Sequence, residues 1–153
     1  MSDYDSFRFH DNQIHGIAFR TADPDRDDWT SDLTLDIDHI LEWVKDDDGV
    51  RFRVQPATLT FHGVTNLSLS LDGTLTGHRV GVALPWILQI ERELVPDPGV
   101  YFDRPYYDWR VVLSSTPSGD LSFGAWGYTL GLRGEAVVQD EQSLTHSQRS
   151  RGG

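Results

Sequence analysis

The sequence contains no cysteine, and this excludes several kinds of chemistry. A chain without thiols forms no disulfides, binds no metal through thiolates and has no cysteine nucleophile. Its 153 residues suffice to bury a core without such cross-links, because a domain of this size hides roughly 70% of the surface that its unfolded chain exposes. We therefore expect one domain that packing alone stabilises.

Long apolar runs are also missing. No stretch approaches the roughly eighteen apolar residues that a membrane-spanning helix requires. The first residues, MSDYDSFRFHDN, are polar and acidic and lack the basic and apolar regions of a secretory signal. The sequence therefore predicts a soluble, cytoplasmic protein.

Basic residues are scarce relative to acidic ones. The chain has 13 Lys and Arg against 24 Asp and Glu, which gives a net charge of −11. Nucleic acids and anionic membranes attract proteins through Lys and Arg, so this balance argues against both as ligands. A basic protein or a cation would be attracted instead, although acidity also serves solubility alone.

The clearest pattern lies between residues 33 and 62. Apolar and polar residues alternate strictly from Leu33 to Asp38, which predicts a strand with one buried face. The charged run from Lys45 to Gly49 is typical of a turn. The return strand changes its alternation at Pro56, where we expect a kink or bulge.

Several other segments read as strands separated by acidic, Gly-containing or Pro-containing turns. In the segment from Leu121 to Leu132 the apolar positions change parity near Gly127, which indicates a bulge or tight bend. The whole pattern predicts a mainly β, single-domain antiparallel β-sandwich or partly open barrel of about seven or eight strands. The strand segments are 13–21, 33–44, 50–61, 67–71, 80–90, 107–113 and 121–132.

Two segments leave alternatives. A strand is favoured for Pro85 to Leu94, in which Trp86, Leu88 and Ile90 share a parity, but a short helix competes because Pro suits a first helical turn. Residues 1–138 are expected to form the antiparallel domain. Residues 139–153 are polar and predicted to be a flexible tail.

Four tryptophans, Trp43, Trp86, Trp109 and Trp126, fall within predicted strands. We expect them to be core or cross-strand packing residues. The alternative is an aromatic-lined pocket or a hot spot for a partner, because Trp is enriched at both.

Histidines and carboxylates are the remaining candidates for chemistry. If the first two strands are neighbours, His10, Asp11, Asp36 and Asp38 would converge into a set that suits a divalent cation. Such a set would also suit a metal-dependent or sugar-acting enzyme. The alternative is that the Asp36 and Asp38 pair lies on a solvated sheet face and that Asp11 caps local backbone.

Sequence motifs for catalysis or cofactor binding are lacking. The chain has no GxSxG, HExxH, Walker-type or GxGxxG motif. We therefore predict no cofactor and no catalytic residue, apart from the divalent metal considered above. A binding protein is favoured over an enzyme, and a small-ligand binder with an apolar cavity between the strands is a further alternative.

Four segments taken in order resemble a group of small uncharacterised bacterial proteins that are mostly β. They are FHDNQIHGI (Phe9 to Ile17), LTLDIDHILEWV (Leu33 to Val44), PATLTFHGVTNL (Pro56 to Leu67) and LSFGAWGYTLGLRGEAVV (Leu121 to Val138). Some relatives of that type are thought to be immunity proteins encoded beside polymorphic toxins. The resemblance spans nearly the whole chain and carries no catalytic motif.

This resemblance implies a protein that occludes a basic partner by electrostatic complementarity and buried aromatic anchors. Carboxylate clusters would then be recognition elements. Two acidic segments are the candidates, with Asp25, Asp27 and Asp28 in one and Asp46, Asp47 and Asp48 in the other. The sequence does not specify an oligomeric state.

Overall fold

The computed structural model describes residues 4–70, 74–75, 82–97, 104–114 and 119–149. Among these residues, no helix is long and apolar enough to cross a membrane. The elements are β1 (Gln13–Arg20), the 3-10 turn η1 (Pro24–Arg26), β2 (Asp32–Asp46), β3 (Gly49–His62), β4 (Thr65–Ser70), β5 (Thr74–Leu75), β6 (Val82–Ala83), β7 (Trp86–Leu94), β8 (Tyr107–Ser114), β9 (Gly119–Ala125), β10 (Gly127–Leu132), β11 (Val137–Gln139) and α1 (His146–Arg149).

The predicted fold class is confirmed, because the protein is mainly β and antiparallel. One sheet of nine strands runs in the order β10-β3-β2-β1-β7-β8-β9-β4, with β11 also paired to β3, while β5 and β6 form a separate two-stranded sheet. The strand count exceeds the prediction partly because the segment expected as one strand from Leu121 to Leu132 bends into β9 and β10.

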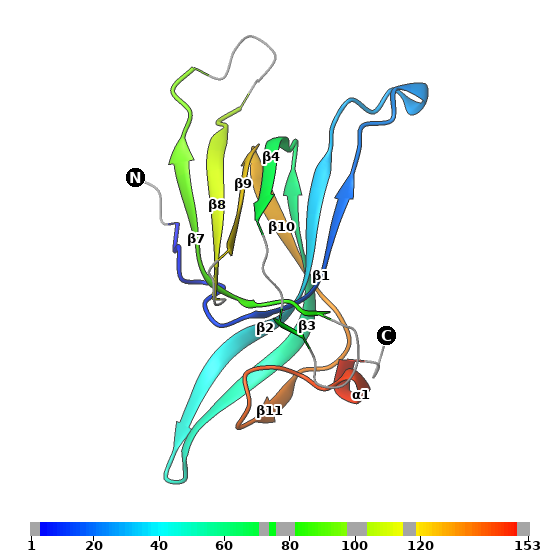
Figure 1. Cartoon of the computed structure of the whole chain (residues 1–153). Helices are drawn as coiled ribbons and strands as arrows, with labels where there is room; N and C mark the ends of the chain where they lie inside the picture. The colour runs from blue at the N-terminus through cyan, green and yellow to red at the C-terminus, as the bar shows by residue number, and fades with distance from the viewer. Residues whose placement is uncertain (1–3, 71–73, 76–81, 98–103, 115–118, 150–153) are drawn as a thin grey trace.

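The sheet curls strongly without closing. β3 passes into β4 and β9 passes into β10, while β3 pairs with β10 and β4 with β9, so the two ends of the strand order are joined through the chain. β1 and β7 meet only at Gln13 and Trp86, and Figure 1 shows them diverging above this point. Of the two predicted architectures, this single curled sheet corresponds to the partly open barrel.

The pairing of β2 with β3 is the longest in the molecule and runs from Asp32 and His62 at one end to Asp46 and Gly49 at the other. The predicted turn is confirmed, and Gly49 takes the positive φ of 124° that closes it. In Figure 1 the hairpin tip projects below the rest of the sheet. The main sheet therefore does not cover the far end of the hairpin, whose apolar side chains must pack against another segment.

The expected bulge at Pro56 is wrong. Pro56 pairs with Asp38 in regular register, and the irregularity lies instead on β2, between Ile40 and Glu42. The alternation changes in β3 because its two halves are covered on opposite faces. Residues 57, 59 and 61 face the main core, whereas Val54 faces a second cluster.

The main core fills the concave side of the curled sheet. Trp109 lies at its centre, 2% exposed, with edge-on contacts to Phe61 and Tyr128. The N-terminal segment adds Phe9, which is buried against the ring of His39. The second cluster lies on the other face of the hairpin and consists of Ile40, Val54 and Leu144, with Phe52 and Val137 packed against it.

Within the segment from Pro85 to Leu94, residues Trp86–Leu94 form the strand β7, so the helical alternative is wrong. A register shift between Ile87 and Gln89 buries both Ile87 and Ile90, whereas Trp86 and Leu88 are 47% and 37% exposed. The predicted sharing of one face by the even-numbered apolar residues therefore fails at this bulge. Trp86 is left at the surface.

The C-terminal segment differs from the flexible tail that the sequence predicts. Residues 139–149 lie across the lower part of β2 and β3, with β11 paired to β3, as Figure 1 shows. Leu144 is 6% exposed and completes the second cluster. The segment packs on the sheet despite its polar composition, because Leu144 is buried and several hydrogen bonds hold the backbone and side chains in place. Residues 150–153 lie outside the described part of the chain.

The corner where β3 passes into β4 depends on Gly63. Its φ is +68°, and a Cβ there would lie 2.9 Å from the ring of Trp126. Trp126 itself spans the predicted bend between β9 and β10, and its backbone N–H donates to the His62 carbonyl at 3.0 Å. Gly127 has nothing within 4 Å of the position of a Cβ.

We predict that Gly63→Ala lowers the free energy of unfolding by about 1–3 kcal/mol, because it adds both backbone strain and overlap with a packed ring. Gly127→Ala is the matched control and should cost less than about 1 kcal/mol. Urea denaturation of both variants measures the difference. Equal stabilities for the two would contradict this account of the corner.

Candidate binding groove

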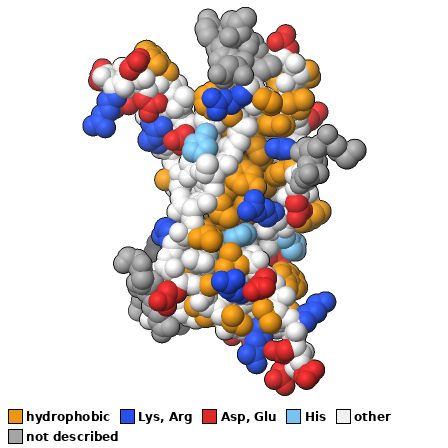
Figure 2. Space-filling model, turned by 180° about the vertical axis from the view of Figure 1, so that it is seen from behind, with side chains coloured by type: hydrophobic (Ala, Val, Ile, Leu, Met, Phe, Trp, Pro, Cys, Tyr) orange, Lys and Arg blue, Asp and Glu red, His pale blue; other side chains and the backbone are white. Residues whose placement is uncertain are grey.

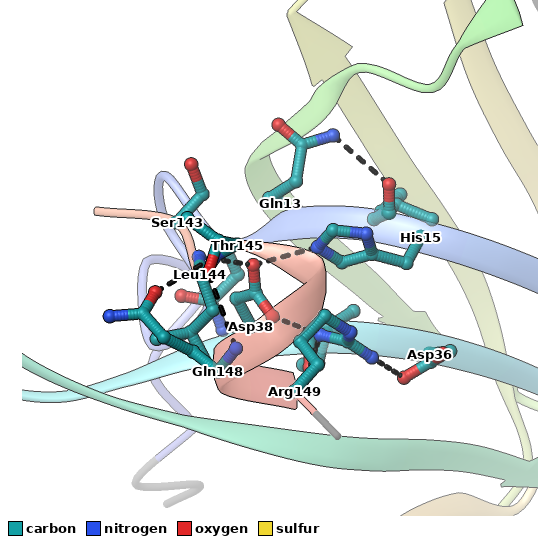
Figure 3. Close-up of polar contacts among 12 residues, drawn as sticks. Gln13, His15, Asp36, Asp38, Ser143, Leu144, Thr145, Gln148 and Arg149 are labelled. Carbon is teal, nitrogen blue, oxygen red and sulfur yellow. Dashed lines mark hydrogen bonds and ion pairs between the residues drawn. The ribbon is translucent and has the colours of Figure 1, made fainter. Parts of the chain in front are cut away.

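The carboxylate of Asp38 is fully buried and takes part in three contacts. Its Oδ2 accepts from the backbone N–H of Leu144 at 2.8 Å and lies 2.7 Å from His15 Nε2. Its Oδ1 accepts from the guanidinium of Arg149. Figure 3 shows these groups converging on Asp38 from β1 and from the C-terminal segment. The buried charge is therefore compensated within the chain.

Asp36 lies two residues earlier, and its side chain is 40% exposed. It forms ion pairs with Arg133 and with the same Arg149 that reaches Asp38. Two arginines thus supply the positive charge that a metal ion would bring to this pair of aspartates. A cation at this position would have to displace them.

His10 and Asp11 lie together but apart from that pair. His10 Nδ1 is 2.6 Å from the Leu88 carbonyl oxygen, and its Nε2 is 3.4 Å from Asp11 Oδ1. Asp11 Oδ2 accepts from the amide of Gln142 at 3.0 Å. Within the described ranges, no three His, Asp or Glu side chains are grouped as a metal site requires. The four residues predicted to converge thus form two separate polar contacts.

Both contacts hold the C-terminal segment against the sheet. Gln142 is bound by Asp11, while Leu144 and Arg149 are bound by Asp38. Residues 140–143 are thereby fixed beside the start of β1. This placement creates a groove that no single stretch of sequence indicates.

The groove has a volume of about 480 Å³. It is formed where the start of β1, the β2–β3 hairpin, the start of β7 and the loop after β11 come together. The residues that line it are Asp11, Gln13, Trp43, Phe52, Trp86, Asp140, Glu141, Gln142 and Ser143.

Its apolar lining is aromatic and largely uncovered. Trp43 and Trp86 are 54% and 47% exposed, and Trp43 packs edge-on against Phe52 with ring centroids 4.9 Å apart. The expectation of a core or cross-strand packing role holds for Trp109 in the core and for Trp43, which pairs across the strands with Phe52. Trp43 and Trp86 also line the groove, as the pocket alternative states. Exposed aromatics gathered in one groove are typical of a site that a partner covers.

The charged lining of the groove is entirely acidic, with Asp11, Asp140 and Glu141. Arg51 lies close by, 4.0 Å from Asp140. The same guanidinium is 3.7 Å from Asp46 in the hairpin turn. Arg51 thus lies between the acidic hairpin turn and the groove. Because all of the charged lining residues are acidic, we call the groove the acidic groove.

The two acidic segments proposed for partner binding are widely separated. Asp46, Asp47 and Asp48 form the hairpin tip next to the acidic groove, whereas Asp25, Asp27 and Asp28 lie in the η1 loop at the opposite end (Figure 1). Seen from behind in Figure 2, acidic side chains mark both extremities. A single small partner site cannot use both segments.

The η1 loop is also engaged internally. Hydrogen bonds from the backbone and hydroxyl of Thr30, together with the guanidinium of Arg20, hold the pKa of Asp28 below its usual value. Arg20 further pairs with Asp32 at 2.9 Å. These contacts engage Asp28 and order this part of the loop.

A larger open cavity of about 600 Å³ lies over β7, β8 and β9, and its charged lining is mixed, with Arg92 and Arg110 beside acidic residues. Arg110 is 2.8 Å from Asp120 and 3.9 Å from Glu91. Arg92 lies over the rings of Tyr4 and Tyr107, 4.3 Å from each centroid. This balance makes it a weaker candidate for a charged ligand than the acidic groove.

The aromatic-pocket alternative included Trp86, but sequence reasoning did not bring Asp140, Glu141 and Gln142 to the same site. Trp86 was placed on the wrong face because the bulge in β7 leaves no mark in the apolar pattern. The other three belong to the segment predicted as a tail. The one usable signal was Leu144, an apolar residue in an otherwise polar stretch.

His39 is buried in the main core, against the ring of Phe9. It is 6% exposed, and its Nδ1 is 2.8 Å from the amide nitrogen of the fully buried Asn12. Burial, aided by the positive charge of Arg8, lowers the pKa of His39 from 6.5 to about 4. The imidazole is therefore neutral in the folded protein at neutral pH.

For the contacts between Asp38 and the C-terminal segment, we predict that Asp38→Asn lowers the free energy of unfolding by about 3 kcal/mol, because it leaves Arg149 without its buried partner. Asp36→Asn, at an exposed pair, should cost about 1 kcal/mol or less. Hydrogen exchange should rise in residues 139–149 of the Asp38 variant first. Unchanged exchange there would show that Asp38 does not hold the segment.

For His39, stability should fall as the pH drops from about 6.5 towards 4. The unfolded histidine binds a proton in this range and the folded one does not, so unfolding is favoured by up to ~1.4 kcal/mol per pH unit. Urea denaturation at several pH values measures the effect against His39→Gln. The wild-type advantage should shrink by about 2 kcal/mol between pH 7 and pH 4.5, and a constant difference would contradict the lowered pKa.

Comparison of the chain with protein-family models, with curated proteins and with solved structures found no match. The resemblance to small bacterial immunity-type proteins therefore remains a prediction. The geometry of the acidic groove is what supports a function.

Proposed function

We propose that this protein is a cytoplasmic, non-enzymatic interaction module that binds a basic protein partner at the acidic groove. The observation that carries the proposal is the combination of uncovered Trp43 and Trp86 with three carboxylates in one groove. Aromatic anchors supply most of the binding free energy in protein interfaces, and charge complementarity adds association rate and specificity.

The rest of the chain suits this role. The net charge of −11 attracts a basic protein over long range. The hairpin tip places Asp46 and Asp48 beside the groove, where Arg51 links them to Asp140. An acidic rim around an aromatic floor orients a basic partner before the aromatic side chains are buried.

The specific version of this proposal is an immunity-type protein that occludes a toxin. It follows from the resemblance of the sequence and from a groove that presents anchors without an evident catalytic group. The partner would be encoded beside the gene for this chain. Occlusion requires a tight complex, and the affinity would come mainly from Trp43 and Trp86.

We predict that the protein encoded next to this gene forms a complex with it. The dissociation constant should rise between about 50 mM and about 300 mM NaCl, because salt screens the acidic rim. Trp86→Ala should raise the dissociation constant at least about tenfold. Trp29→Ala is the matched control, because Trp29 is 71% exposed on the distant η1 side of the protein, and it should change affinity little.

Isothermal titration calorimetry with the two purified proteins measures these constants. Growth of cells that express the neighbour alone or together with this chain tests neutralisation. The proposal fails if the neighbour neither binds nor is neutralised, or if Trp29→Ala weakens the complex and Trp86→Ala does not.

A further inference from the structure

This fold already shows how it holds a guanidinium group. Arg92 lies 4.3 Å from the ring centroids of both Tyr4 and Tyr107 and 5.7 Å from that of Trp109. Arg104 lies over the ring of Trp126 at 4.6 Å. Arginines above aromatic faces are therefore a recurrent contact in this protein, in line with the attraction of a cation to a π-system.

The acidic groove offers the same kind of surface, with Arg51 at its edge, 4.0 Å from Asp140. Trp43, Phe52 and Trp86 provide the aromatic surface, and Asp11, Asp140 and Glu141 provide the negative charge. No lysine or arginine is among the lining residues, all of which belong to the described part of the chain. The groove therefore provides the aromatic rings and the negative charge for a contact with a guanidinium. Arg92 forms a contact of this kind within the chain.

The carboxylates differ in how far the chain already engages them. Asp140 faces Arg51 at 4.0 Å, at the outer limit of an ion pair, and is 82% exposed. Asp11 binds a neutral amide, that of Gln142 at 3.0 Å, and lies 3.4 Å from His10. Glu141 forms no ion pair with any other residue that the structure describes. Negative charge is thus left for an incoming cation.

We infer that the acidic groove is a receptor for one arginine side chain of the partner, with its guanidinium against Trp43 and Trp86 and its N–H groups directed at the carboxylates. This inference rests on the proposed function and names the group that the partner contributes. Arginine fits better than lysine because its planar, weakly hydrated head stacks on rings and also donates in pairs to carboxylates. A lysine ammonium stays hydrated and makes a single-point contact.

The test uses three capped tripeptides, Gly-Arg-Gly, Gly-Lys-Gly and Gly-citrulline-Gly, titrated into the intact protein. Citrulline keeps the shape of arginine and loses its charge. The indole N–H signals of the five tryptophans, assigned by single substitutions, report binding by NMR. The arginine peptide should shift the signals of Trp43 and Trp86 and leave that of Trp29 in place. The lysine peptide should bind more weakly, and the citrulline peptide should bind least.

Variants locate the site. Trp86→Ala and Glu141→Gln should each weaken binding of the arginine peptide by about two- to fivefold, which is the loss expected for one exposed cation–π or ion-pair contact. Trp29→Ala should leave it unchanged. Thermal melts establish that each variant is folded, and the comparison of the three peptides on the wild-type protein needs no variant.

The inference is overturned if citrulline binds as well as arginine, if lysine binds more tightly, or if Trp29 responds in place of Trp43 and Trp86. A complex with the neighbouring protein that forms normally alongside such a result would keep the proposed function and remove only the arginine receptor. Specific binding of the arginine peptide, without any complex with the neighbouring protein, would rule out that protein as the partner and support the arginine receptor.

Discussion

The long antiparallel pairing of β2 with β3 is the constraint on which the rest of the structure depends. Its apolar residues near Leu35 and Leu59 face the concave core, but the hairpin continues past the sheet that covers it. Beyond Asp38 the opposite face carries the apolar side chains, and the C-terminal segment covers it through Leu144. One strand pair therefore has two cores on opposite faces, and the end of the chain must fold back to complete the second one.

The buried carboxylate of Asp38 explains how a polar segment is held there. A charge out of contact with water requires compensation by opposite charge and hydrogen bonds. Arg149 and the Leu144 amide supply these from one end of the chain, and His15 supplies a contact from the other. Such a pair adds little net stability compared with apolar packing, but it favours one position of the segment over others. That position sets the wall of the acidic groove.

The position of the acidic groove thus follows from how β7, the β2–β3 hairpin and the C-terminal segment pack. Trp86 faces outward because a bulge after Ile87 turns the core residues of β7 inward. Trp43 is outside the core because the hairpin tip extends beyond it. Asp140 and Glu141 line the groove because they belong to the C-terminal segment that Asp38 holds against the sheet. Half-exposed aromatic side chains gathered beside carboxylates add little to the stability of a monomer, and they are the basis of the proposed binding function.

By itself the sequence determined the class of fold, the main strands and the hairpin turn, because alternation with period two and the turn chemistry of residues 45–49 are local properties. It also pointed to Asp36, Asp38 and the tryptophans as notable residues. Only the tertiary structure decided that arginines compensate the aspartates, that Trp43 and Trp86 share a groove and that residues 139–149 pack on the sheet. These depend on pairings between residues about a hundred positions apart, such as Asp38 with Arg149, and on bulges that shift which face is buried. No local pattern encodes either, since a one-residue shift in register reverses every side chain beyond it.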